Sequence, residues 1–88
     1  MNGTYTKAER AHIEQVKTLS CSVCDKPGPS DAHHIRQSQP YTCVALCKSC
    51  HQDSKLGWHG QKIMWKIHKM DELDALNVTY RRLLDAAR

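Results

Sequence analysis

The stretch that decides the fold contains three short motifs: Cys21-Ser-Val-Cys24, His33-His34-Ile35 and Cys47-Lys-Ser-Cys50-His51. The two Cys-x-x-Cys pairs supply four thiolates, which form the closed tetrahedral shell of a structural zinc ion, with no open position for water. The segment between the pairs is slightly longer than the roughly 15–20 residues of a simple zinc ribbon. We therefore expect all four cysteines to bind zinc, and we expect a hairpin carrying the two histidines to lie between them.

Length and cysteine content limit the class of protein. A chain of 88 residues forms one domain, expected over 1–88, and buries too little apolar surface to be stable without a metal or another cross-link. Five cysteines are an odd number and no secretory signal precedes them, so zinc in a reducing compartment is favoured over disulfides. Cys43 is expected to be a small buried core residue rather than a ligand.

Composition also bears on partners and location. The formal net charge of +4 suits a polyanionic partner without requiring one. No apolar run approaches the roughly 20 residues that span a bilayer. A cytoplasmic protein with no membrane contact is therefore expected.

Apolar side chains at helical spacing predict helices at both ends of the chain. An N-terminal helix is expected over 5–20, with Thr4 or Thr6 able to cap its first turn. C-terminal helices are expected over 60–87, with Asp71 able to cap the last of them.

Three segments resemble the HNH, or ββα-metal, nuclease family: His33-His34-Ile35, a strand ending Val44-Ala-Leu-Cys47, and Lys48-Ser-Cys-His51-Gln-Asp-Ser-Lys55. The resemblance covers roughly residues 21 to 55. It implies an α+β fold, a small zinc-stapled ββα-metal domain with its zinc knuckles and core over 21–56 and with flanking helices. The size of the chain and its Gly57-Trp-His-Gly-Gln61 segment are also similar to small phage and prophage HNH proteins of the recombination-enhancement type.

The resemblance implies roles for the histidines. Carried over from the family, His34 is the general base, while His33 and His51 hold a divalent cation. His59 is an alternative distal ligand, and His51 is preferred because it lies on the helix that follows the hairpin. The family's central asparagine, which orients the base through its backbone carbonyl, falls at Thr42, which presents the same carbonyl with a weaker side-chain brace.

Three cationic side chains flank these histidines. Arg36 follows the histidine pair, and Lys48 and Lys55 lie on the expected helix that carries His51. In this interpretation all three contact DNA phosphates, although such a side chain is more often a solvated surface charge.

These features predict a metal-dependent endonuclease that hydrolyses DNA phosphodiester bonds with low intrinsic sequence specificity. The expected cofactors are structural Zn²⁺ and a second divalent cation, Mg²⁺, Mn²⁺, Ni²⁺ or Zn²⁺. The expected partners are DNA and a recombination or DNA-delivery protein. Two other classes stay open: a non-catalytic, zinc-stabilised nucleic-acid-binding or adaptor module on the same scaffold, and a zinc ribbon that binds protein.

Overall fold

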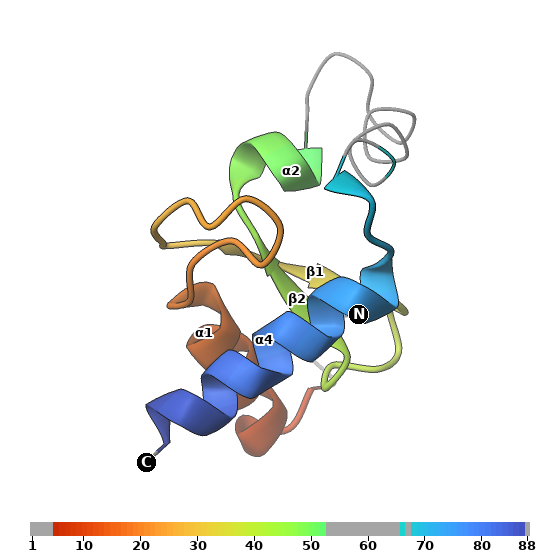
Figure 1. The fold of residues 1–88 in the computed structure, drawn as a ribbon. Helices are drawn as coiled ribbons and strands as arrows, with labels where there is room; N and C mark the ends of the chain where they lie inside the picture. Colours follow the sequence, from red (N-terminus) through yellow and green to blue (C-terminus); the bar gives the residue numbers. More distant parts are fainter. Residues whose placement is uncertain (1–4, 53–65, 67, 88) are drawn as a thin grey trace.

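The computed structural model of the chain describes residues 5–52, 66 and 68–87. An antiparallel sheet of two strands lies at the centre, α1 and α4 pack against it, and α2 lies at the end of the sheet away from α1 (Figure 1). This arrangement confirms the predicted α+β class. The elements, in chain order, are α1 (Lys7–Lys17), β1 (Asp31–His34), β2 (Cys43–Leu46), α2 (Lys48–Gln52) and α4 (Glu72–Ala86).

A capping box starts α1. The hydroxyl of Thr6 accepts a hydrogen bond from the Glu9 amide at 3.1 Å, and the Glu9 carboxylate accepts one from the Thr6 amide at 2.7 Å. Two backbone amides that a helix terminus leaves without partners are thereby satisfied. The helix ends at Lys17, whose carbonyl accepts from the Ser30 amide at 2.8 Å. It is therefore shorter than the expected range of 5–20.

The strand register divides the sheet into two faces. β1 and β2 pair from Asp31↔Leu46 to His34↔Cys43, and because directly paired residues share a face, the assignment of every strand residue follows. What we call the cysteine face carries Asp31, His33, Val44 and Leu46. The α1 face carries Ala32, His34, Cys43 and Ala45.

Both faces of β2 are covered, which explains why all of its residues are buried. On the cysteine face, Val44 and Leu46 pack with Ala75 of α4 and with three cysteines, Cys21, Cys47 and Cys50. On the α1 face, Cys43 and Ala45 pack against Val16 of α1. The core is thus thin and has two layers, as expected of a chain with few aromatic residues.

The first Cys-x-x-Cys pair forms a tight turn. The Cys21 amide donates to the Lys26 carbonyl at 2.9 Å, and the Asp25 amide donates back to the Cys21 carbonyl at 3.0 Å. Asp25 has a φ of 64°, a left-handed conformation that aspartate tolerates better than most residues. Gly28 follows, and a Cβ there would lie 2.8 Å from the backbone oxygen of Leu19, so close that only glycine fits.

A buried hydroxyl connects α4 to this turn. The Thr79 hydroxyl donates to the Ala75 carbonyl at 2.9 Å and accepts from the Ala45 amide at 3.3 Å. Its remaining lone pair faces the Ser22 hydroxyl at 2.6 Å, so Ser22 is the donor in that pair. The single proton and both lone pairs of Thr79 are used, and α4 is held to both the turn and β2.

Arg82 makes a second connection from α4 to the same turn. One guanidinium nitrogen donates to the Ser20 carbonyl at 3.4 Å and to the Cys21 carbonyl at 3.1 Å, and another pairs with the Asp25 carboxylate. The helix itself starts with a capping box, in which Asp71 and Asp74 bind each other's amides at 2.8 and 3.0 Å.

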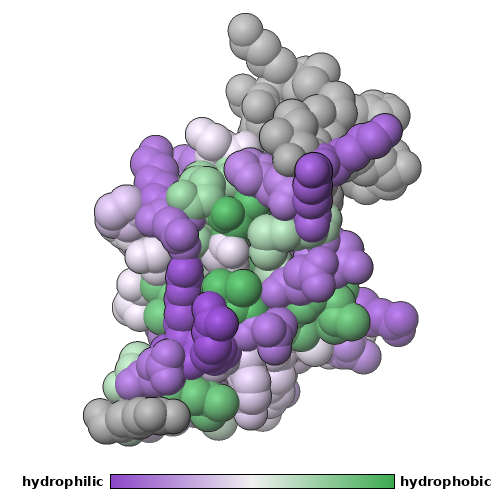
Figure 2. Space-filling model, viewed as in Figure 1, coloured by the Kyte–Doolittle hydropathy of each residue, from purple (hydrophilic) through white to green (hydrophobic). Residues whose placement is uncertain are grey.

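The face that α4 crosses is mostly hydrophilic, with apolar residues between the polar ones (Figure 2). Leu73, Tyr80 and Leu84 of α4 and Tyr41 of the β1–β2 connection are the exposed large hydrophobic residues in the described parts of the chain. Across the same residues, the helices are too short or too polar to cross a lipid bilayer.

Candidate functional site

The sulfur atoms of Cys21, Cys24, Cys47 and Cys50 all lie within 4.8 Å of one another. Two of them, Cys24 Sγ and Cys47 Sγ, are 3.6 Å apart. A zinc ion about 2.3 Å from four tetrahedral sulfurs places those sulfurs about 3.8 Å apart, whereas a disulfide needs about 2.05 Å. The geometry therefore fits a metal such as zinc, as the sequence predicted, and does not fit disulfides.

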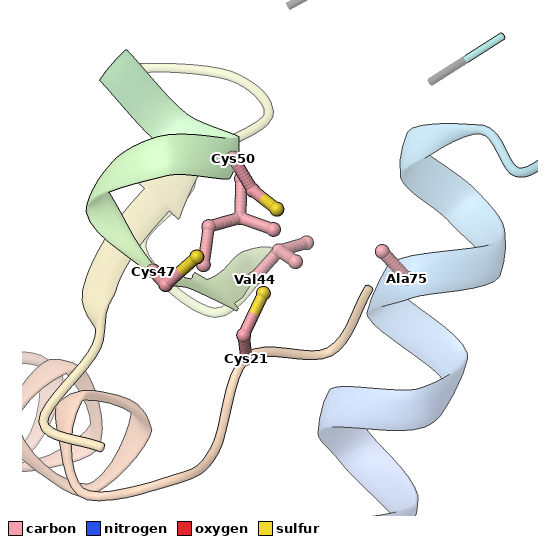
Figure 3. Close-up of a cluster of buried hydrophobic side chains, with 6 residues drawn as sticks. Cys21, Val44, Cys47, Cys50 and Ala75 are labelled. Atoms are coloured by element: carbon pink, nitrogen blue, oxygen red, sulfur yellow. The ribbon is translucent and has the colours of Figure 1, made fainter. Parts of the chain in front are cut away.

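Two segments bring these sulfurs together. Cys21 and Cys24 come from the turn after α1, Cys47 directly follows β2, and Cys50 lies in α2. Figure 3 shows three of them, Cys21, Cys47 and Cys50. Val44 of β2 and Ala75 of α4 pack in the same hydrophobic cluster, and Ala75 faces the cysteines with its methyl group. Cys21 is fully buried and Cys47 and Cys50 are 5% exposed, whereas Cys24 is exposed, so the site borders solvent on the Cys24 side.

The thiols of Cys21 and Cys50 differ in acidity. Burial alone would raise the pKa of Cys21, but backbone hydrogen bonds at Cys24, Cys47 and Val23 and a side-chain bond from Cys24 together lower it to about 7. The pKa of Cys50 is raised, first by burial and then by the negative charge of Cys21. Four thiolates in one small volume repel one another, and a bound divalent cation removes that repulsion.

Cys43, the fifth cysteine, lies on the other face of the sheet. Its thiol donates to the Pro40 carbonyl at 2.8 Å, and burial raises its pKa to about 11. It packs with Val16 and Ala45 and takes no part in the sulfur cluster.

Two histidines meet on the cysteine face of the sheet. The rings of His33 (β1) and His51 (α2) have centroids 5.2 Å apart and an interplanar angle of 70°. Asp31 lies two residues before His33 on the same face, and its Oδ2 is 3.1 Å from His51 Nδ1. The hydrogen bond with His51, followed by the nearby charge of Lys48, lowers the pKa of Asp31.

A carboxylate from α4 reaches His33. Glu72 Oε2 lies 2.5 Å from His33 Nε2, and the two residues are 39 positions apart in the chain. Neither Glu72 nor Asp31 was predicted from the sequence as a site residue. Asp31 could have been predicted from the sequence, because the two-residue period of a strand places it on the same face as His33. No local pattern points from His33 to Glu72, since their contact depends on how α4 docks.

His34 faces the opposite way. It lies on the α1 face, where its ring stacks on Tyr5 with centroids 6.0 Å apart and an interplanar angle of 6°. Its Nε2 is buried and has no hydrogen-bond partner among the residues that the structure describes. The carbonyl of Thr42 accepts from the Ile35 amide at 3.3 Å, and the Thr42 hydroxyl donates to the Gln39 carbonyl at 3.0 Å.

The cationic residues are only partly described. Arg36 is exposed in the segment that follows β1. Lys48 Nζ lies 3.7 Å from Asp31 Oδ1 with its side chain 81% exposed, so the pair contributes little to stability. Lys55 and His59 lie outside the described residues.

The structure thus brings the four cysteines together in one place and His33 with His51 in another, and it directs His34 to the other face of the sheet. No family model, no curated protein and no solved structure matches the chain. What is established is an α+β domain with four cysteines placed to bind a metal ion such as zinc.

Proposed function

We propose that the protein is a metal-dependent endonuclease of the HNH type that hydrolyses DNA phosphodiester bonds. The observation that supports the proposal best is the pair of histidines, His33 and His51, which is separate from the cysteine cluster and in which Asp31 orients the His51 ring. A domain whose only metal is structural needs four thiolates and nothing more.

His33 and His51 would hold the second ion. An ion about 2.1 Å from a nitrogen of each ring lies about 3.2 Å from each ring centroid, which gives a centroid separation of about 4.5–5.2 Å at common bond angles. The observed 5.2 Å is within that range. A divalent ion bound there neutralises the negative charge that develops on the phosphate during cleavage.

Asp31 has a positioning role in this proposal. A histidine that ligates a metal usually donates its other ring N–H to a carboxylate, which fixes the tautomer and the ring orientation. Asp31 Oδ2 accepts from His51 Nδ1, so His51 would meet an ion through Nε2. Because Asp31 and His33 are both on β1, the same strand orients one ligand and supplies the other.

His34 is the proton acceptor in the proposal. A neutral imidazole can take a proton from water through its unprotonated ring nitrogen, and a buried ring nitrogen without a structural partner calls for an explanation of its own. The stacking on Tyr5 directs His34 away from His33. Because His34 lies on the opposite face of the sheet from His33, catalysis requires the end of β1 to change conformation when DNA binds, so that the His34 ring leaves Tyr5 and reaches the ion.

The test is cleavage of supercoiled plasmid and of single-stranded circles by the zinc-loaded protein, with Mg²⁺, Mn²⁺ or Ni²⁺ added in turn and EDTA as a control. We expect nicking by the wild type and its loss in His34→Ala. His12→Ala is the matched control, because the His12 Nε2 is also buried without a partner in the described parts of the chain, and His12 lies on α1 outside the site.

The alternative function has its own outcome in this experiment. If the folded, zinc-loaded wild type binds DNA and cleaves it with none of these ions, the protein is a non-catalytic binding module. If His12→Ala and His34→Ala lose cleavage equally, the loss reflects damage to the α1 face, and His34 is not the base.

A further inference from the structure

We infer that Glu72 is a third protein ligand of the ion held by His33 and His51. This inference deepens the proposed function, because it concerns the same centre, and it extends that centre to α4. The helix lies outside the part of the chain that resembles HNH nucleases, so the resemblance does not supply this ligand.

The inference is based on the contact between Glu72 and His33, in which the histidine is mostly buried and the glutamate is partly exposed. Glu72 Oε2 is 2.5 Å from His33 Nε2, with the His33 side chain 12% exposed and the Glu72 side chain 39% exposed. The ring nitrogen thus faces a carboxylate inside the domain, and the carboxylate itself borders solvent. That is the arrangement expected of a metal site that must also admit a phosphate and water.

The distances require only a small change for an ion to bind. Two donors about 2.1 Å from one ion lie about 3.0–3.4 Å apart, so the Glu72 and His33 ligand atoms would separate by about 0.5–0.9 Å from the observed 2.5 Å. In the described parts of the chain, the four cysteines are the one group of three or more His, Cys, Asp or Glu residues whose ligand atoms all lie within 4.8 Å of one another. His33, His51 and Glu72 together are therefore more widely spaced than that. Some closure of the His51 ring toward Glu72 and His33 is therefore part of binding.

The position of Glu72 is fixed by the packing of its helix. Glu72 directly follows the capping residue Asp71, and Ala75, one turn later, is fully buried against the cysteine cluster. Thr79 holds the same helix to Ser22 at 2.6 Å. The carboxylate also lies in the first helical turn, where the helix dipole favours negative charge. Its approach to His33 is thus a consequence of how α4 docks.

The resulting ligand set makes a prediction about the ion. Two imidazoles and one carboxylate suit Mn²⁺ or Zn²⁺ better than Mg²⁺ or Ca²⁺, which prefer oxygen ligands alone. The single carboxylate leaves a divalent ion with a net positive charge, as a site that attracts a phosphate requires. Asp31 is already paired with His51 and Lys48, and it stays in its orienting role.

The experiment is a Mn²⁺ titration of the full-length, zinc-loaded protein, with free Mn²⁺ measured by its electron paramagnetic resonance signal. We expect the wild type to bind one Mn²⁺ per chain and Glu72→Gln to bind it at least about tenfold more weakly. Glu72→Asp keeps the carboxylate and should lose less affinity. Glu14→Gln, the same change on the exposed side of α1, should match the wild type. Zinc content and thermal melting verify that each variant is folded.

Two results would overturn the inference. Equal Mn²⁺ affinity in Glu72→Gln and the wild type would show that Glu72 is not a ligand, and tighter binding in the variant would show that the carboxylate blocks the site. If either result comes with plasmid nicking by the wild type, the proposed function stands without Glu72. If the wild type neither binds Mn²⁺ nor cleaves DNA, both the inference and the proposed function are wrong.

Discussion

Cys43 and Cys47 are four positions apart, yet their side chains meet different surroundings. The two-residue period of β2 places Cys43 on the α1 face, and Cys47 follows the end of the strand and joins the sulfur cluster. The Cys-x-x-Cys spacing was sufficient to distinguish the four cluster cysteines from the fifth. Each Cys-x-x-Cys pair supplies two of the four zinc ligands, and Cys43 belongs to neither pair.

The buried Cys43 thiol predicts a pH dependence of stability. Its folded pKa of about 11 lies above the ordinary value of 9.0. Below pH 9 the thiol is protonated in both states and its contribution is complete; as the pH rises from 9 toward 11, the unfolded chain loses the proton first and stability falls. At pH 10 the wild type should have lost about 1 kcal/mol more than Cys43→Ala, relative to pH 8.

Urea unfolding of the two zinc-loaded proteins at pH 8 and pH 10 measures this difference. The cluster cysteines titrate in both proteins, so their contribution cancels in the comparison. Identical losses in wild type and Cys43→Ala would contradict the raised pKa of the buried thiol.

At the level of the element, helix starts were the most predictable feature. Thr6 and Asp71, both named from sequence as possible caps, each accept from the amide of the third residue that follows. A helix cap depends only on residues that are close together in the sequence, so the sequence alone can predict it. The end of α1 was less predictable, because it depends on the Ser30 amide, which arrives from beyond the zinc turn.

The capping box of α1 leads to a prediction for Thr6→Ala. Removing the hydroxyl leaves the Glu9 amide without its partner and should reduce the free energy of unfolding by about 1 kcal/mol. Thr18→Ala, at the other end of the same helix, is the control and should cost less, because the exposed Thr18 hydroxyl only donates to the Gln15 carbonyl. Urea unfolding followed by circular dichroism compares the two. Equal losses would mean that the capping box contributes nothing specific.

The docking of α4 depends on the buried contact between the Thr79 and Ser22 hydroxyls, which no sequence pattern predicts. Thr79→Val keeps the shape of the side chain and leaves the Ser22 hydroxyl buried without its partner, at an expected cost of about 1–3 kcal/mol. The double variant with Ser22→Ala removes both hydroxyls and should cost less than the sum of the two single changes. Chemical denaturation of all four proteins gives the coupling energy, and simple additivity would show that the contact is not energetically important.

On the scale of the whole molecule, the cysteine cluster is the place where four segments of the chain meet. It joins the turn after α1, the end of β2, α2 and, through Ala75, α4. The sequence predicted this cluster and the hairpin between its halves, because both follow from spacing. The expectation that His33 and His51 lie together came from the family resemblance, and the contact of Glu72 with His33 was not predicted, since it depends on where α4 crosses the sheet.

Removal of zinc should therefore unfold the domain as a unit. In a strong chelator we expect loss of the helical circular dichroism signal and of cooperative thermal unfolding, with recovery on addition of Zn²⁺. Cys50→Ser should behave like the chelated protein. Cys43→Ala removes a cysteine outside the cluster and should keep its zinc and its melting transition. A chelated wild type that still melts cooperatively would show that the core is stable without the metal.

The contacts of Thr79 and Arg82 with the first Cys-x-x-Cys turn also set the limits of a transplantable module. A graft of residues 21–55 into another scaffold would carry all the zinc ligands but would leave the Ser22 hydroxyl and the carbonyl of Cys21 without their partners on α4. The smallest unit that can be moved between proteins intact therefore extends from the cap of α1 to the end of α4, far beyond the motif by which such domains are recognised.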